Sequence, residues 1–522
     1  MANAAPFVLN TTSQDAFINY FKEVLLTANG VVSAQRTRFE EVDRAYQRET
    51  DNTDIQTQSR LQNKAGNVQP IQNVTVPIVM PQIEAAVVYQ SSVFLTGVPI
   101  FGVVSSAEFI DQALQMETKL DNDAVRGGWT RELMMSFRDG FKYNFCPVEV
   151  CWDKEKTPGL VTDVEFSTKE GKPVLDLIWA GNKLKRLDPY NTFVDPRVPP
   201  SEVYKRGEFA GYNEYLSRIE LKQEILKMSD SIVQNITKAF ESSTPTGMVT
   251  ASGKELQDYY VPSINPTVNI RENYKGNMNW LSWAELSVGK AASSIEYKDS
   301  YIKTVLYCKI LPSEFSLNVP SKNTPQIWKL IIINYSVIIH AERQTNAHGW
   351  IPVLIGQPNE DGLSYQTKSL ADNAIPFQEV TTAFMSSILA SRRRAISDRT
   401  LYDPSRVLAA HINSENPSAK IPVRPAAYGK NISEAVHQFP YREDQGAFSI
   451  AQIRDLIGMS NMLAGQNPAK QGQFVKGNKT REEFSDVMQN SNGRDQLASL
   501  LFEAQIFTPM KTIFKALPPG PG

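Results

Sequence analysis

The sequence is poor in the residues that cross-link a chain or hold metals. It contains 3 cysteines and 4 histidines among 522 residues. The cysteines are too few for a disulfide framework and include no Cys-x-x-Cys pair, so we expect reduced structural thiols. No two histidines stand four residues apart on an expected helix, which argues against a zinc site. We predict no bound metal and no cofactor.

Long hydrophobic runs are also missing. No stretch approaches the ~18 consecutive apolar residues of a membrane-spanning helix. The first residues have neither the basic nor the apolar part of a secretion signal. Hydrophobic residues make up 41% of the chain and charged residues 21%, which is typical of a globular protein. We therefore expect a protein that is made in the cytoplasm and has no membrane partner.

The chain has no excess of positive charge. It carries 54 Lys+Arg against 56 Asp+Glu, a net charge of -2. Non-specific DNA binding through a broad surface depends on neutralising many phosphates, which this balance does not favour. Any contact with DNA must therefore be local, or must be multiplied by oligomerisation.

Catalytic motifs are absent as well. The sequence has no GxSxG, HExxH, DxDxDG or GxGxxG. The segment GQFVKGNKT at residues 472–480 approaches a phosphate-binding loop, but Asn478 separates Gly477 from Lys479. We favour a flexible polar loop there over a nucleotide site.

Three carboxylates leave one enzymatic alternative open. Asp188, Asp195 and Glu202 could converge on a metal, as in a nuclease. Asp188 and Asp195 each precede a proline, which forces extended, turn-bounded backbone. We favour turn capping for these acids and predict that the protein is not an enzyme.

Hydrophobic periodicity predicts several helices and fewer strands, in an α+β chain long enough for more than one domain. Residues 15–29 and 31–48 read as a helical hairpin around Asn29-Gly30. A polar arm at 50–76 and an irregular segment at 241–280 interrupt the pattern. A helix capped by Ser105-x-x-Glu108 is predicted to run to about Val125. Further helices are predicted at 83–95, 129–143, 218–240, 447–463, 481–491 and 496–515, and strands at 147–152, 159–166, 174–180, 301–310, 327–334, 336–342 and 420–424. The three strands between 301 and 342 predict a compact β unit inserted between helical regions.

A long helix is predicted over residues 376–397, with Pro376 in its first turn and Asp403-Pro404 beyond its end. Small residues in its first half allow close helix neighbours. Arg392, Arg393 and Arg394 follow in its second half. A buried helix with a solvated basic end explains this pattern without a further function.

Lys183, Lys185 and Arg186 form a second small basic cluster. In a monomer either cluster is most simply a solvated surface. In a closed ring, one cation per subunit would become a belt of charge around the central hole.

The order of several motifs resembles the portal, or head-to-tail connector, proteins of tailed bacteriophages. The motifs are RTRFEEVDRAYQRE, WTRELMMSFRDGFKYNFCPVEVCWD, LDPYNTFVDPR, HGWIPVLIGQP, SLADNAIPFQ and YDPSR. Agreement at each site is loose, but it extends in the same order over most of residues 35–515. This collinearity carries the resemblance.

The resemblance implies a multi-domain portal fold, with a mainly helical wing and stem and a small β-containing clip, in a ring of about twelve copies. It places the wing at residues 1–270, a first stem segment at 271–296, the clip at 297–352, a second stem or channel helix at 353–403 and C-terminal wing or crown helices at 404–522. It implies DNA-channel contacts at Arg392, Arg393, Arg394, Lys183, Lys185 and Arg186, and clip docking through Trp328, Lys329, Tyr335 and Trp350.

The implied role is a structural one in the virion. The ring would occupy one capsid vertex, contact the major capsid or scaffolding protein, and conduct double-stranded DNA during packaging and ejection. It would dock the terminase large subunit first and adaptor or tail proteins afterwards. Another virion structural protein, such as a tail adaptor or a capsid-associated protein, is the alternative that the absent active site also fits.

Overall fold

A computed structural model of the chain describes both helices and strands, so the α+β class is confirmed. The chain divides into two compact units. Unit 1 comprises Met1–Asp43, Pro81–Asn373 and Gly465–Gly522, and unit 2 comprises Arg44–Met80 and Ala374–Ala464. The described residues are 7–47, 75–97, 100–103, 106–158, 175–228, 233–242, 248–249, 255–256, 300–344, 349–362, 367–396, 400–407, 422–429, 431, 435–438, 444–465 and 493–516.

The N-terminal segment forms one helix, α1 (Thr11–Gln47), rather than the predicted hairpin. Asn29-Gly30 does not break it. A glycine inside a helix costs only about 1 kcal/mol relative to alanine. Apolar side chains on both sides of the glycine, such as Phe21 and Phe39, are fully buried, and their packing outweighs that cost.

The next helices agree with the sequence pattern. They are α3 (Val79–Phe94), α4 (Ile110–Arg126, after the short turn η1, Ala107–Phe109) and α5 (Trp129–Tyr143). Gly128 separates the last two helices with a left-handed backbone, φ 65°, which glycine adopts without steric cost. The three helices therefore lie where their hydrophobic spacing predicts.

Unit 1 contains a five-stranded sheet of order β3-β4-β7-β8-β9. Its strands are β3 (Thr192–Val194), β4 (Phe209–Ser217), β7 (Ser300–Ile310), β8 (Gln326–Ile333) and β9 (Val337–Gln344). The strands predicted between 301 and 342 are present, but they are not a self-contained β unit. β7 pairs along its length with β4, from the region assigned to the wing. The sheet thus joins segments that the predicted boundary at 297 separates.

A second sheet of order β10-β1-β2 lies in the same unit. It consists of β1 (Cys146–Pro158), β2 (Leu175–Arg186) and β10 (Val353–Gly356). β10 carries part of the HGWIPVLIGQP motif and pairs antiparallel with β1, opposite Cys146 to Glu149. Two strands far apart in the sequence therefore meet through motifs that both contributed to the resemblance.

Side chains alternate between the two faces along each strand of the five-stranded sheet. An apolar cluster covers each face. Trp328 and Leu330 of β8 belong to an apolar cluster with Phe17 and Phe21 of α1. Ile331, from the opposite face of β8, belongs to a second cluster. That cluster includes residues of α7 (Arg218–Lys227) and α8 (Ile236–Glu241), which replace the single helix predicted at 218–240.

Unit 2 is built around two helices, α11 (Leu370–Ile396, which begins in unit 1) and α13 (Asp444–Ala464). α11 begins six residues before the predicted start. Ser369 and Asp372 form a reciprocal capping box, in which each side chain accepts a hydrogen bond from the other's backbone N–H, at 3.0 and 2.7 Å. Pro376 consequently lies inside the helix.

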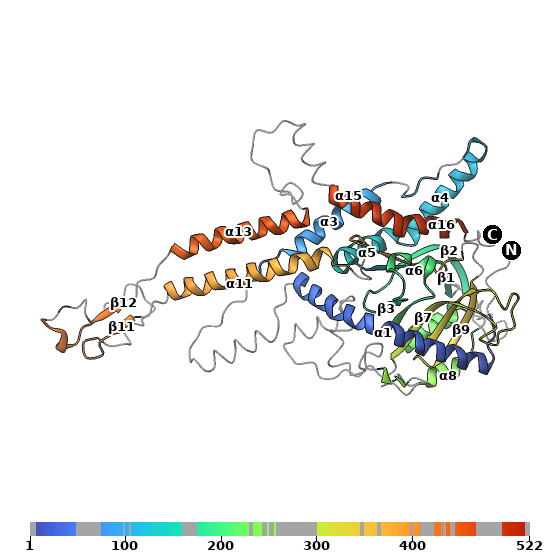
Figure 1. The fold of residues 1–522 in the computed structure, drawn as a ribbon, viewed down its shortest axis with the longest axis horizontal. Coiled ribbons are helices and arrows are strands. Elements are labelled where there is room, and N and C mark those ends of the chain that lie inside the picture. The colour runs from blue at the N-terminus through green and yellow to red at the C-terminus, as the bar shows by residue number, and fades with distance from the viewer. Residues whose placement is uncertain are drawn as a thin grey trace, which may run out of the picture. The chain divides into compact units, whose positions relative to one another are not determined.

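Between these helices, the short strands β11 (Thr400–Tyr402) and β12 (Val436–Gln438) pair antiparallel. A bridge between Val407 and Val423 and the turn η4 (Pro425–Ala427) accompany them. Figure 1 shows α11 and α13 both leading to these strands. We call the described residues of this region, 400–407, 422–429, 431 and 435–438, the tip lobe.

The remaining described elements are short or C-terminal. The predicted helix at 496–515 is present as α15 (Gly493–Phe502), a π-helical segment (Glu503–Phe507) and α16 (Thr508–Ala516). The other elements are η2 (Pro200–Glu202), α6 (Val203–Arg206), β5 (Met248–Val249) and β6 (Glu255–Leu256). The arm at 50–74, the strand at 159–166, the first stem segment at 271–296, the loop at 472–480 and the helix at 481–491 lie outside the described residues.

Candidate functional site

The basic cluster of Lys183, Lys185 and Arg186 is divided between the two faces of β2. Lys183 and Lys185 are two residues apart and share one face, whereas Arg186 lies on the other. Lys183 pairs with Asp153 at 2.6 Å, and both side chains are about 40% exposed. Burial lowers the pKa of Lys183, but the hydrogen bond to Asp153 and the negative charge of Asp153 raise it by more. The net shift of the pKa is upward, so the lysine stays charged. The three cations therefore do not form one exposed patch.

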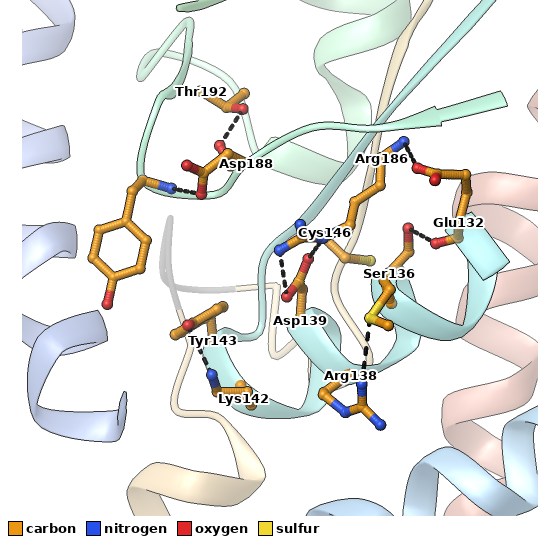
Figure 2. Close-up of polar contacts among 12 residues, drawn as sticks. Glu132, Ser136, Arg138, Asp139, Lys142, Tyr143, Cys146, Arg186, Asp188 and Thr192 are labelled. Atoms are coloured by element: carbon orange, nitrogen blue, oxygen red, sulfur yellow. Dashed lines mark hydrogen bonds and ion pairs between the residues drawn. The ribbon is translucent and has the colours of Figure 1, made fainter. Parts of the chain in front are cut away.

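Arg186 is the centre of a buried polar contact in unit 1. Figure 2 shows its guanidinium directed at the Asp139 carboxylate of α5, which it holds with two nitrogens. Its backbone N–H donates to Glu132 at 2.9 Å. Burial lowers the pKa of Arg186, but the Asp139 carboxylate outweighs it and keeps the guanidinium charged. This contact fastens α5 to β2 and uses the charge inside the fold.

Lys185 belongs to a chain of ion pairs along the sheets. Its ammonium contacts Glu214 of β4, which also accepts from Lys303 of β7 at 3.0 Å. Burial raises the pKa of Glu214, but the two ammonium groups lower it to about 2 overall. Lys303 pairs in addition with Glu224 of α7. As with Arg186, the charge of Lys185 is matched within the subunit.

Arg392, Arg393 and Arg394 occupy the last turns of α11, in unit 2. The structure describes the backbone of these three residues as helix but does not describe their side chains. The chain distance from Arg394 to Thr400 of β11 is only six residues. These arginines therefore lie at the end of α11 nearest the tip lobe.

The four candidate docking residues belong to unit 1. The Trp328 side chain has no exposed surface and packs edge-on against Phe7, with the ring centroids 5.8 Å apart. Tyr335 is 1% exposed and contacts Phe21. Trp328 and Tyr335 are therefore core side chains, and neither has surface accessible to a docking partner. Lys329 faces Glu149 at 4.0 Å. Only Trp350, edge-on to Tyr204 at 5.2 Å, combines partial exposure with an aromatic surface.

The carboxylates next to proline cap turns, as predicted. Asp188 accepts from the backbone N–H of Tyr190 at 3.1 Å, and Asp195 accepts from that of Arg197 at 3.1 Å. Glu202, for which turn capping was also favoured, differs in that it pairs with Arg206, four residues away. Within the described ranges, no group of three or more His, Cys, Asp or Glu side chains could hold a metal ion.

Sequence reasoning missed a polar cluster centred on Asp43, near the end of α1. Its two carboxylate oxygens accept from the Tyr143 and Tyr190 hydroxyls, each at 2.6 Å, and it also contacts the Lys142 ammonium. Asp43 is 2% exposed. We call Asp43 and these three partners the Asp43 cluster. One carboxylate thus ties together three motifs, those around residues 43, 143 and 190.

Two arginines of α1 extend these ties. Arg36 donates to the carbonyl of Tyr190 at 2.9 Å, and Arg38 donates to that of Tyr143 at 2.7 Å. Arg38 also pairs at 3.0 Å with Asp372, of the SLADNAIPFQ motif. Four of the six segments that carry the resemblance therefore converge in unit 1. The alternating charges of RTRFEEVDR were the only sequence signal of this cluster.

A second missed group joins the two sheets. Glu149 of β1 accepts from the Tyr212 hydroxyl at 2.7 Å and the Tyr307 hydroxyl at 2.6 Å. Burial raises the pKa of Glu149, but the Lys329 and Lys185 charges and both tyrosine hydroxyls lower it overall. In the sequence, Glu149 is marked only as a single acid between two valines, Val148 and Val150, which the structure shows to be buried. The contacts are those of a buried structural brace.

The tip lobe carries the YDPSR motif. Asp403 accepts from the backbone N–H of Ser405 at 2.9 Å and pairs with Arg406 at 3.2 Å, while its own N–H donates to the Ala435 carbonyl at 2.8 Å. These bonds fix the turn that follows β11. Tyr402 is 41% exposed and Tyr428 is 75% exposed. The lobe therefore combines a fixed backbone with accessible aromatic rings.

Among the helices that the structure describes, none is long and apolar enough to cross a membrane. No protein-family model matches the chain, and a search of curated proteins finds no match.

Proposed function

We propose that the chain is a bacteriophage portal protein. Copies of it form a ring at one vertex of the capsid, which conducts double-stranded DNA into the head during packaging and out of it during ejection. The ring docks the terminase large subunit and later the adaptor or tail proteins. It contacts the major capsid or scaffolding protein and has no catalytic role of its own.

The observation that carries this proposal is the architecture of unit 2. Two helices of 27 and 21 residues frame a small β-containing lobe, the order of elements that the resemblance implies for stem, clip and stem. The convergence of four of the resembling motifs on α1 in unit 1 is a second observation that supports it. Residues that match in order along the sequence also meet in space there.

Unit 2 changes the proposed assignment of the parts. We now assign the clip to the tip lobe, and the stem to the unit 2 part of α11 and to α13. Residues 300–344 belong with the wing, because β7 pairs with β4 in a shared sheet. Trp350 is then a wing residue, and the exposed Tyr402 and Tyr428 are the better candidates for docking.

The candidate DNA contacts change in the same way. Lys185 and Arg186 are matched by carboxylates inside unit 1, so they have little charge to offer to phosphates. Arg392, Arg393 and Arg394 remain candidates for the channel wall, at the end of the proposed stem nearest the clip.

Native mass spectrometry of the purified protein, with negative-stain imaging, tests the proposal. We expect closed rings whose mass is a multiple of 58.4 kDa and which have a central hole. A chain that stays monomeric and cleaves DNA or hydrolyses ATP would overturn the proposal. Rings that bind tail proteins but not terminase would favour the tail-adaptor alternative.

A further inference from the structure

One side of α11 exposes apolar residues. Val380 is 44% exposed and Phe384 is 36% exposed. Pro376 and Ala383 are exposed as well. Val380, Ala383 and Phe384 follow Pro376 by four, seven and eight residues, which places all four along one helix face. The opposite face is buried through Gln378 and Thr381, and the buried Ile388, four residues after Phe384, ends the exposed stripe. We call the four exposed residues the α11 stripe.

α13 has a similar exposed face near its C-terminal end. Met459, Met462 and Leu463 are 58%, 78% and 51% exposed. Ile453 and Ser460, on the other side of the helix, are buried. We call the three exposed residues the α13 stripe. Isolated exposed apolar residues are common on proteins, but here one unit carries two clusters of them.

The two stripes lie at the same level of unit 2. Pairing of β11 with β12 brings together the end of α11 and the start of α13. At about 1.5 Å per helical residue, the α11 stripe lies about 18–30 Å from Ile396, and the α13 stripe about 22–28 Å from Asp444. Measured from the tip lobe, the two stripes therefore overlap in height.

Matched height is what a ring requires. Rotation about the axis of a cyclic ring keeps every residue at its own height when the helices run along that axis. A head-to-tail contact joins two different surfaces of neighbouring copies, and these must lie at equal heights. We infer that the α11 stripe of one copy packs against the α13 stripe of the next copy. This inference rests on the proposed ring and names the surfaces that close it.

Disulfide cross-linking of assembled rings tests the contact. We would prepare Val380→Cys, Met459→Cys and the double variant, and oxidise each after assembly. A head-to-tail contact predicts that only the double variant gives a ladder of covalent oligomers on a non-reducing gel. The wild type controls for its own cysteines, of which Cys146 and Cys308 are buried.

The outcomes separate the inference from the proposed function. Rings of the double variant that give no ladder, or only a cross-link within one chain, overturn the inference and leave the portal proposal standing. Dimers from a single variant overturn it too, because they indicate a two-fold contact. If the wild type forms no ring, both fall.

Charge substitution gives a second test that needs no oxidation. Val380→Lys and Met459→Lys should each shift the protein from rings to monomers in native mass spectra, because each places a charge in an apolar contact. Ile219→Lys is the matched control, since Ile219 is 69% exposed on α7 of unit 1. Rings that survive both stripe variants would overturn the inference.

Discussion

Unit 1 and unit 2 are stabilised in different ways. Unit 1 encloses large apolar side chains, with Trp129, Trp328 and Tyr307 each less than 2% exposed. In the described part of unit 2, the buried positions of α11 include the polar residues Gln378 and Thr381, and its large apolar residues are partly on the surface. Unit 1 can therefore be stable through its own core, whereas unit 2 gains further burial only when something packs against it.

Polar groups also serve the two units differently. In unit 1, buried ion pairs such as Arg186 with Asp139 join elements that already share an apolar core. In unit 2, Gln378 is itself a joint: it accepts from the backbone N–H groups of Ile78 and Val79, each at 3.0 Å, and donates to the Ala45 carbonyl at 2.8 Å. A single polar residue thus connects three segments where an apolar core is small.

The largest effect is expected from Trp328→Ala. Removing a fully buried indole should lower the free energy of unfolding of unit 1 by ~3–5 kcal/mol. Denaturant unfolding measures this loss, and hydrogen exchange should show it in β8 but not in α13. Trp350→Ala is the control and should cost less, because Trp350 is partly exposed. Equal losses would remove the distinction between core and surface.

Arg186→Gln should have the next largest effect. It should lower the free energy of unfolding by about 3 kcal/mol, because it leaves the Asp139 carboxylate buried without its charged partner. Lys183→Gln, the control on the same strand, removes an exposed ion pair and should cost less than ~1 kcal/mol. Both are measured by denaturant unfolding. A loss for Lys183 as large as for Arg186 would contradict the division of the basic cluster between two faces.

Gln378→Ala tests the polar joint of unit 2. It removes the partner of two buried backbone N–H groups and of one partly buried carbonyl, and we expect the free energy of unfolding to fall by ~2 kcal/mol. Hydrogen exchange should speed up at residues 45–47 and 76–79 and stay unchanged in β8. Glu379→Ala is the control, since Glu379 is exposed on the next position. Unchanged exchange in Gln378→Ala would show that unit 2 does not depend on this joint.

A smaller, pH-dependent effect is expected from Glu214. Its pKa in the folded state is about 2, against an ordinary 4.5, so its ion pairs stabilise the fold fully above pH ~4.5 and lose this effect as the pH falls toward ~2. Glu214→Gln should be less stable than the wild type at pH 7, and the difference should shrink between pH 4.5 and 2. A difference that stays constant over this range would show that the ionised carboxylate is not stabilising.

Hydrophobic periodicity predicted the elements better than it predicted their partners. Trp129 to Tyr143 was predicted as a helix with the bounds that the structure gives, because that pattern is local. The hairpin at Asn29-Gly30 was wrong, since burial of residues on both sides of Gly30 keeps α1 continuous. A local turn signal is weak when tertiary packing opposes it.

The predicted role of the basic cluster on β2 changed for the same reason. The presence of Lys183, Lys185 and Arg186 could be read from the sequence, but their carboxylate partners come from separate elements at Asp153, Glu214 and Asp139. Spacing along one strand does not reveal which acids face it. The sequence could therefore propose a basic cluster but could not decide whether its charge was available.

The sequence by itself determined the mixture of helices and strands, the positions of most of them, and the turns at Asp188 and Asp195, because these depend on side-chain periodicity and on proline. Only the tertiary structure decided that β7 joins β4, that Asp43 binds three motifs together, and that paired strands between α11 and α13 form a lobe around residues 400–438. Those features depend on contacts between residues far apart in the chain, whose free energy is gained only when the whole unit packs.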